Sequence, residues 1–204
     1  MLRYDAVLGS GIAEMLDDVA SLGIELFRHY PYLYDDDLGY EKNYLKGLSE
    51  NEESFVVAAY RDDEVVGAAT ALPLLSSAEI LNGVREHFSR AGFSPSTCYY
   101  YSEILVRPAQ RYRGIAKGFY RRRDETAIRL GYSTVCFAAL NAEEIRSPRP
   151  SDYFDPSDMW RRMGFVQHRD IYVDHRWPTL QPDGTTLEMK HRLYFWIRHL
   201  ETDD

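Results

Sequence analysis

The segment from Val106 to Gly118, VRPAQRYRGIAKG, predicts a short basic loop between a strand and a helix. The residues before it, 96–106, are aromatic and β-branched, as in a strand that Pro108 brings to an end. The residues after it, 114–131, repeat apolar side chains at helical spacing and finish at a glycine. A second strand is predicted at 133–140. This order favours a parallel or mixed sheet that binds a ligand where its strand ends.

The charge of this region is local. Seven cations and no acid lie between residues 107 and 123, although the whole chain has a formal net charge of -8, so the remainder carries -15. A nucleic-acid-binding protein normally has a basic domain, and here the surroundings would repel a phosphate backbone. A small polyanion fits better. Nucleic-acid binding through 107–123 is the weaker alternative, because Asp124 and Glu125 lie within one helical turn of Arg121 and Arg122.

The predicted start of the helix at Gly114 has the properties of an anion site. The first N–H groups of a helix lack intrahelical partners, and the helix dipole adds about half a positive charge there. A glycine also lets an oxygen approach the backbone closely. The segment is not a Walker P-loop, because Lys117 precedes Gly118 and neither Ser nor Thr follows, and it matches a dinucleotide fingerprint poorly.

The remaining pattern is Gln/Arg-x-x-Gly-x-Gly/Ala, which residues 111–116 fulfil as RYRGIA, preceded by the strand and its Val-x-Pro ending. Near the end of the chain, residues 159–165 read MWRRMGF. Together these segments resemble the GNAT superfamily of acyl-CoA-dependent N-acetyltransferases. The order of predicted elements fits the family over nearly the whole chain.

The resemblance implies an α/β fold, α+β in some schemes, with a mixed and largely antiparallel central sheet of about six or seven strands flanked by helices. A central parallel pair of strands, 96–106 and 133–140, would be splayed. We expect a single domain over residues 1–204 with insertions at about 76–96 and 141–157. The sequence also predicts a hairpin at 54–72 and, near the end, a long connection at 174–186 between two strands.

The resemblance further implies acetyl-CoA as cosubstrate. Backbone groups of residues 111–116 would hold the pyrophosphate, and the main chain of 104–106 would pair with the pantetheine arm. Arg107, Arg113 and Lys117 are candidates for the outer phosphates. The expected coenzyme-binding residues are Ile104, Leu105, Val106, Arg111, Tyr112, Arg113, Gly114, Ile115, Ala116 and Lys117.

An amine must be neutral to attack a thioester, and for an amine with a pKa near 10.4 deprotonation at pH 7 costs about 4 to 5 kcal/mol. Glu103, in the strand beside the expected thioester, is the candidate base. Regular alternation puts Tyr100, Ser102 and Ile104 on the opposite side of the strand, unless a bulge resets it. Tyr100 and Ser102 are therefore the alternates. A backbone N–H near Ile104 or Leu105 would stabilise the oxyanion.

The proton donor to the leaving thiolate is harder to assign. Many relatives have a tyrosine four residues before the glycine of the Gly-Phe signature, and here that residue is Trp160. Tyr153, just upstream, is the substitute candidate. The acceptor amine is expected between the first two helices, where aromatic and acidic side chains suit a cation. The candidates are Tyr32, Tyr34 and Asp35, with Asp36 and Asp37 beside them.

Other features point away from further chemistry. The six histidines show no metal-ligand spacing, so no metal is expected. Cys98 and Cys136 lie in apolar runs without CxxC spacing.

No segment has the roughly 18 to 20 apolar residues of a membrane span, and the N-terminus has no apolar signal core, so we expect a soluble, cytoplasmic protein. The acceptor, a small-molecule or peptide amine, is not identified. A homodimer through 193–200 and a noncatalytic coenzyme A sensor are both compatible with the sequence.

Overall fold

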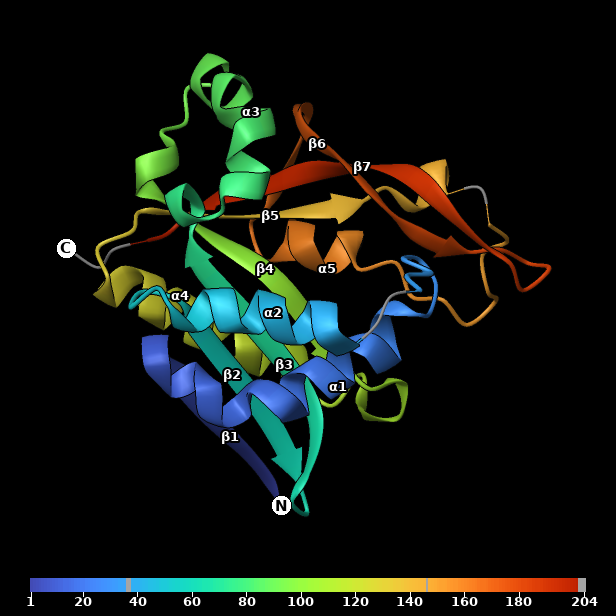
Figure 1. The fold of residues 1–204 in the computed structure, drawn as a ribbon. Helices are drawn as coiled ribbons and strands as arrows, with labels where there is room; N and C mark the ends of the chain where they lie inside the picture. Colours follow the sequence, from blue (N-terminus) through green and yellow to red (C-terminus); the bar gives the residue numbers. More distant parts are fainter. Residues whose placement is uncertain (36–37, 146, 202–204) are drawn as a thin grey trace.

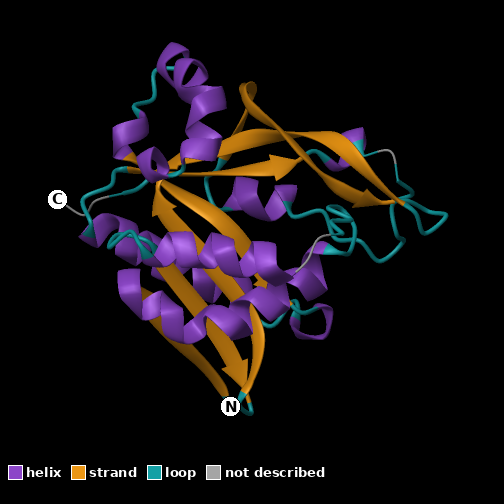
Figure 2. Ribbon diagram, viewed as in Figure 1, coloured by secondary structure: helices purple, strands orange, loops and turns teal. Residues whose placement is uncertain are grey.

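The computed structural model describes residues 1–35, 38–145 and 147–201, with the backbone alone at 38–41, 44 and 78–83. Helices and strands alternate along most of the chain (Figures 1 and 2). The elements are β1 (Leu2–Leu8), η1 (Gly9–Met15), α1 (Leu16–Phe27), α2 (Leu38–Ser49), β2 (Phe55–Arg61), β3 (Glu64–Pro73), η2 (Leu74–Ser76), α3 (Ala78–Arg90), η3 (Pro95–Thr97), β4 (Cys98–Val106), η4 (Pro108–Gln110), α4 (Ile115–Arg129), β5 (Thr134–Leu140), η5 (Ala142–Glu144), α5 (Ser157–Arg162), β6 (Val166–Leu180) and β7 (Thr186–His199).

One seven-stranded sheet runs through the molecule in the order β1-β2-β3-β4-β5-β7-β6. All neighbouring strands are antiparallel except β4 and β5, which are parallel. The β4–β5 pairing ends at Tyr100↔Cys136, although β4 continues to Val106 and β5 to Leu140. The two strands diverge beyond that pair, as Figure 1 shows. The predicted mixed sheet with a splayed parallel pair is therefore confirmed.

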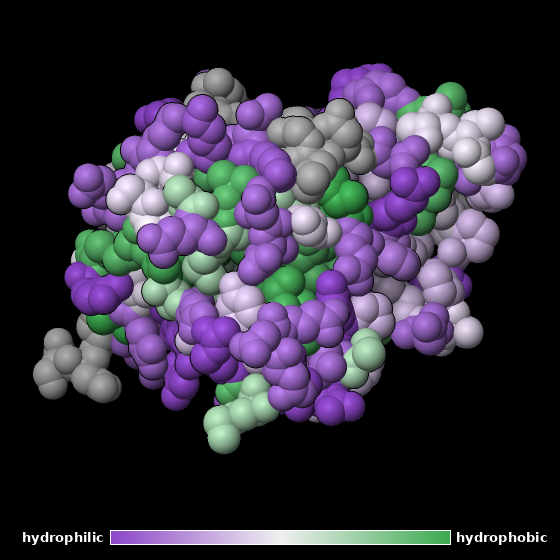
Figure 3. All heavy atoms as spheres, turned by 60° about the horizontal axis from the view of Figure 1, so that its bottom comes forward, coloured by the Kyte–Doolittle hydropathy of each residue, from purple (hydrophilic) through white to green (hydrophobic). Residues whose placement is uncertain are grey.

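Two hydrophobic clusters cover the two faces of this sheet. On the first face, the buried cluster includes Val19 of α1, Leu45 of α2 and Phe88 of α3. On the second face, it includes Phe119 of α4, and Trp160 of α5 packs against its edge. Hydrophilic side chains cover most of the molecular face seen in Figure 3, with smaller apolar patches between them. Burial of apolar surface in these two layers is the main stabilising contribution to the fold.

Local sequence signals account for the β2–β3 hairpin. Its turn contains Asp62 and Asp63 with φ of 52° and 65°, the left-handed conformation that two-residue hairpin turns require and that Asp tolerates. The hairpin predicted at 54–72 is thus confirmed. The first predicted insertion, 76–96, contains helix α3, which packs against β6 on the first face.

The prediction for residues 174–186 is wrong. Instead of a long connection, β6 continues to Leu180, and only 181–185 turn the chain into β7. The strand runs through Pro178, which has no N–H for a ladder hydrogen bond. Pro178 is tolerated because β6 lies at the edge of the sheet. The resulting β6–β7 hairpin is long and supports the α1–α2 loop, as described below.

Candidate active site

The loop between β4 and α4 leaves backbone N–H groups open at the start of a helix. Gly114 has a φ of 80°, and in the described part of the chain no side chain caps α4. The first N–H groups of α4, at 115–117, have no intrahelical acceptor because of their position. Tyr112 is also in the left-handed region, with a φ of 61°, and its side chain is exposed. The local backbone therefore has the open N–H groups that the predicted anion cradle requires.

The space beside Gly114 is open. A Cβ atom added at this position would meet no atom within 4 Å, so packing does not require the glycine. The positive φ of Gly114 does require a glycine, and the close approach of an anion to this backbone would require one too. Gly118, one turn later, differs, because a Cβ there would lie 2.4 Å from the hydroxyl of Tyr4. The first glycine thus serves the open cradle and the second serves packing against β1.

Two of the seven cations in this region are tied up in ion pairs. Arg107 pairs with Glu64 and, at 3.0 Å, with Glu25. Arg121 lies 3.7 Å from Glu125 on the same helix. Arg107, which the sequence suggested for an outer phosphate, therefore joins β4 to β3 and α1 instead.

Two more cations serve packing. Arg122 lies over the ring of Tyr4, with its Cζ 3.9 Å from the ring centroid, and Arg123 is buried with 1% of its surface exposed. The cations that remain exposed around the cradle are Arg111, Arg113 and Lys117.

A β-bulge in β4 decides which way Glu103 faces. On β3 the paired residues Thr70 and Leu72 are two apart, whereas their partners on β4, Glu103 and Tyr100, are three apart. The extra residue resets the alternation, so Glu103 and Tyr100 share the first face. Consistently, Leu105 packs in the first-face cluster. Strict alternation would have put Tyr100 on the other face of the sheet from Glu103. The bulge, which the sequence left open as the alternative, puts both on the first face.

Arg123 of α4 lies directly beneath this bulge. Its Nη1 donates to the backbone oxygens of Glu103 at 3.2 Å and Thr70 at 3.5 Å. Its Cζ lies 4.2 Å from the ring centroid of Tyr101 and 4.6 Å from that of Tyr120. Burial lowers the pKa of this guanidinium. Arg123 was not among the residues predicted for the site, although three successive arginines in a helix that covers a sheet cannot all face solvent.

The alternates to Glu103 lie nearby. The Ser102 hydroxyl lies 2.8 Å from that of Thr70, so it is already bonded within the bulge. Tyr100 is 6% exposed, and burial raises its pKa strongly, so its phenol stays protonated. The next residues of β4, 104–106, pair with β3 on one side and lie beyond the last β5 pair on the other. Their free edge is where the expected pantetheine arm would pair.

Tyr32 lies in the α1–α2 loop, where the acceptor was expected. Its ring meets that of Phe27 edge to face at 5.2 Å, and Phe27 packs against the first-face cluster. Burial raises the pKa of the Tyr32 phenol, and the negative charge of Glu103 raises it further. The predicted acceptor residue Tyr32 and the predicted base Glu103 thus lie on the same face of the sheet.

Tyr153 packs against the α1–α2 loop. Its ring meets that of Tyr30 edge to face at 4.7 Å, and the Cζ of Arg149 lies 5.0 Å from its ring centroid. Tyr30 also donates from its hydroxyl to the backbone oxygen of Ala142 at 3.4 Å. Burial raises the pKa of Tyr153 to about 12. The second predicted insertion therefore touches the α1–α2 loop.

Asp35 and Tyr34 attach the α1–α2 loop to the β6–β7 hairpin. The Asp35 carboxylate pairs with Arg28 at 2.8 Å and accepts a hydrogen bond from the Thr186 hydroxyl at 2.5 Å. Tyr34 forms an isolated bridge with Thr179. The Asp35 carboxylate is thus already paired. Asp36 and Asp37, also suggested for the acceptor, lie outside the described residues.

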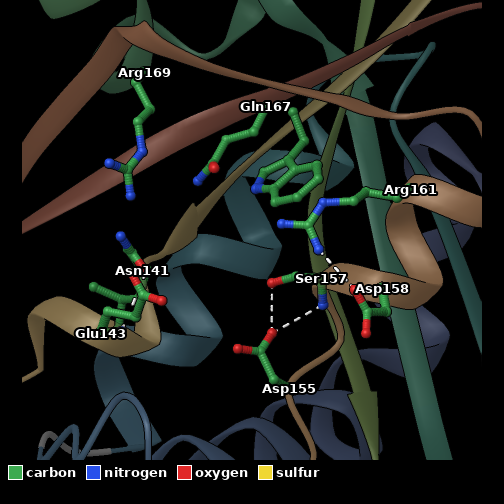
Figure 4. A pocket seen from close by; sticks show the side chains of 10 residues that line it. Asn141, Glu143, Asp155, Ser157, Asp158, Arg161, Gln167 and Arg169 are labelled. Carbon is green, nitrogen blue, oxygen red and sulfur yellow. Dashed lines mark hydrogen bonds and ion pairs between the residues drawn. The ribbon is translucent and has the colours of Figure 1, made fainter.

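A second, polar pocket of about 240 Å³ lies between η5, α5 and the start of β6 (Figure 4). Several of its polar groups bind one another: Asp155 accepts from Ser157, and Arg161 pairs with Asp158 at 2.7 Å. The pocket is lined by Leu140, Asn141, Glu143, Asp155, Ser157, Asp158, Arg161, Gln167, Arg169 and Trp196. It does not include the residues of the bulge or the cradle.

Within residues 1–35, 38–145 and 147–201, no three His, Cys, Asp or Glu side chains come together as a metal site would require. None of the helices in the same ranges is both long and apolar enough to cross a membrane.

Comparison with known proteins agrees with this geometry. The model of the acetyltransferase (GNAT) family matches residues 17–148. The chain therefore belongs to the GNAT family of acetyltransferases. No curated protein matches the sequence.

Solved structures with the same fold share little sequence with this chain. The ribosomal-protein-S18-alanine N-acetyltransferase of Escherichia coli is 10% identical, with a TM-score of 0.55, over 100% of this chain and 97% of that one. A polyamine N-acetyltransferase of Drosophila melanogaster, which forms N-acetylagmatine, is 11% identical, with a TM-score of 0.58, over 98% and 100%. An aminoglycoside 6'-N-acetyltransferase solved with coenzyme A is 13% identical, with a TM-score of 0.57, over 98% and 99%.

Proposed function

We propose that this protein transfers the acetyl group of acetyl-CoA to a primary amine of a small molecule or peptide, by direct attack in a ternary complex. The observation that carries the proposal is the arrangement of the open cradle at Gly114 and the free edge of 104–106, which together lead to the divergence of β4 and β5. Phosphates in the cradle and a thioester beside the bulge would meet an acceptor from the first face.

In this mechanism Glu103 takes a proton from the amine, directly or through water. The bulge supports this role because it turns Glu103 toward the first face, where Tyr32 of the acceptor loop lies. The backbone N–H groups of Ile104 or Leu105 would stabilise the oxyanion of the tetrahedral intermediate.

Tyr153 is a candidate hydrogen-bond donor to the leaving sulfur. With a pKa of about 12 it stays protonated at neutral pH. Full proton transfer to a thiolate whose acid has a pKa near 8.5 would cost about 5 kcal/mol. Tyr153 therefore suits a donated hydrogen bond better than complete proton transfer.

The chemical class of the acceptor is proposed from the side chains expected to line its binding site. Tyr32 and Tyr34 offer aromatic faces that attract a cationic amine. The structural neighbours described above act on a polyamine, an aminoglycoside and the alanine of a ribosomal protein, all of which present amines. Among these, small polyamines are the first acceptors to test, since their positive charges also complement the net charge of the chain.

The second candidate function is a coenzyme A sensor without catalysis, favoured by Trp160 in the place of the usual tyrosine. Nucleic-acid binding through 107–123 is less well supported, since four of the seven cations are paired or packed within the protein. A cytoplasmic location and a homodimer stay predictions.

Two measurements test the proposal. Calorimetry with coenzyme A should detect binding that Gly114→Val weakens. A thiol-release assay with acetyl-CoA over polyamines, aminoglycosides, amino acids and short peptides should then give turnover. Binding without release over the whole panel would favour the sensor, and no coenzyme A binding at all would refute both candidates.

A further inference from the structure

Tyr120 and Trp160 cover the point at which β4 and β5 part, on the second face of the sheet. Tyr101 is the first β4 residue beyond the last β4–β5 pair, and the ring of Tyr120 lies 6.2 Å from its ring. Phe137 is the first β5 residue beyond that pair, and the ring of Trp160 lies 4.8 Å from its ring. The expected thioester would end between these two covered residues.

Buried N–H donors without acceptors gather around this point. In the described part of the chain, Trp160 Nε1 and the Nε and Nη2 atoms of Arg123 are buried and have no hydrogen-bond partner. The Cζ of Arg123 lies 4.6 Å from the ring centroid of Tyr120. Unpaired buried donors are costly and uncommon, so those of Trp160 and Arg123 call for a partner such as a ligand or a water molecule.

The pKa of Tyr120 is raised less than its burial alone would raise it. Burial raises the pKa of Tyr120, which is 2% exposed, but the charge of Arg123 and the N–H groups of Trp160 and Arg123 oppose that rise. Among the residues that the structure describes, Trp160 Nε1 and the Nε and Nη2 atoms of Arg123 make no hydrogen bond to this hydroxyl or to any other acceptor. At neutral pH the phenol is protonated, and the tyrosinate would be stabilised by a cation shielded from water.

We propose that Tyr120 gives its proton to the sulfur of coenzyme A, with Arg123 and Trp160 positioning and polarising its hydroxyl. This inference rests on the proposed acyl transfer. As the C–S bond breaks, its electron pair goes to sulfur, which takes the Tyr120 proton and leaves as the thiol. The amine loses one proton to Glu103 as its N–C bond forms. Glu103 later returns that proton to the tyrosinate through water, so protons balance over one turnover.

Tyr120 is better supported than Tyr153 for this step. Both phenols lie beside an arginine, but Arg149 at Tyr153 is exposed, whereas Arg123 is 1% exposed. A buried charge is screened much less than an exposed one. Trp160 then has a role of its own, because its unpaired indole N–H would donate to the tyrosinate that forms on α4.

The test compares binding of coenzyme A and desulfo-coenzyme A by calorimetry at pH 7 and about pH 9, and needs no acceptor. Tyr120 and Arg123 should stabilise the bound thiolate, so at pH 9 the wild type should prefer coenzyme A by about 5- to 20-fold more than at pH 7. Tyr120→Phe should lose this gain and keep its affinity for desulfo-coenzyme A. Tyr99→Phe is the matched control, because it removes an equally buried hydroxyl that bonds the Glu53 backbone oxygen at 2.6 Å.

Other results would overturn the inference. One is a wild-type preference that does not change with pH, which needs no variant and decides the matter even if Tyr120→Phe does not fold. Another is a Tyr120→Phe protein that keeps the full gain, or a gain that disappears in Tyr153→Phe instead. Failure of the wild type to bind either ligand would refute the proposed function itself.

Discussion

The guanidinium of Arg123 donates from Nη1 to the backbone oxygen of Glu103, 3.2 Å away, from inside the protein core. This contact joins α4, which starts at the cradle, to the bulge that turns Glu103 toward the first face. The cradle and the candidate base are therefore held in register by one buried side chain.

Replacement of Arg123 by methionine should separate stability from activity. The free energy of unfolding should change by no more than about 2 kcal/mol, since the cost of burying a cation is removed along with its hydrogen bonds. Turnover should fall at least about tenfold, because the bulge relaxes. Denaturation and steady-state kinetics measure the two effects. Arg122→Met, at the preceding position of α4, is the control. Unchanged turnover in Arg123→Met would contradict this role of Arg123.

Gly114→Val should weaken coenzyme A binding by about 100-fold or more, because a side chain and a strained positive φ both disturb the cradle. Arg113→Ala should weaken it by less than about tenfold, as for an exposed charge. Calorimetry measures both. Gly92→Val is the control, because Gly92 has a φ of 83° and nothing within 4 Å of its added Cβ, as at Gly114, but lies outside the cradle. A larger loss in Arg113→Ala would mean that side chains hold the phosphates.

Glu103→Gln should lower kcat by about 10² to 10⁴ and flatten the low-pH side of its pH profile. The wild-type rate should fall with pH as the carboxylate is protonated, and glutamine has no such titration. Rates measured across pH with a saturating amine test this, with Glu125→Gln, an exposed residue of α4, as control. An unchanged profile would rule out Glu103 as the base.

Asp35→Asn should loosen the α1–α2 loop from the β6–β7 hairpin. The loss of stability should be small, about 0.5 to 1 kcal/mol, because Arg28 is largely exposed. Hydrogen exchange should quicken at the amide of Leu180, which donates to the Leu33 backbone oxygen at 2.8 Å. Asp17→Asn, which breaks an exposed pair with Lys42, is the control. A higher KM for the amine without faster exchange would instead indicate direct contact with the acceptor.

Asp174 should make the β6–β7 hairpin sensitive to acid. Hydrogen bonds from Arg192 and Lys190 lower its pKa to about 2, from an ordinary value of 3.8. The stabilisation is present above about pH 4 and is lost as the pH falls toward 2. Asp174→Asn should therefore cost about 1 to 2 kcal/mol at pH 7 and little at pH 2. Thermal unfolding across pH measures the difference, and a constant gap between wild type and variant would contradict it.

Local patterns were sufficient for much of the fold. The strand, basic loop and helix around Gly114 were predicted because a helix start and a flexible glycine act through neighbouring backbone groups. The Asp62–Asp63 hairpin was predicted for the same reason. The end of β6 was predicted wrongly, because the length of a strand depends on the partner strand with which it pairs, here β7.

The site divides in the same way. The sequence by itself determined the cradle, its open glycine and the presence of Glu103 in the strand beside it. Only the tertiary structure decided that a bulge turns Glu103 to the face of Tyr32, that four of seven cations are used within the protein, and that Arg123 and Tyr120 lie at the divergence of β4 and β5. Register, burial and ion pairing depend on residues far apart in the chain, and no local spacing encodes them.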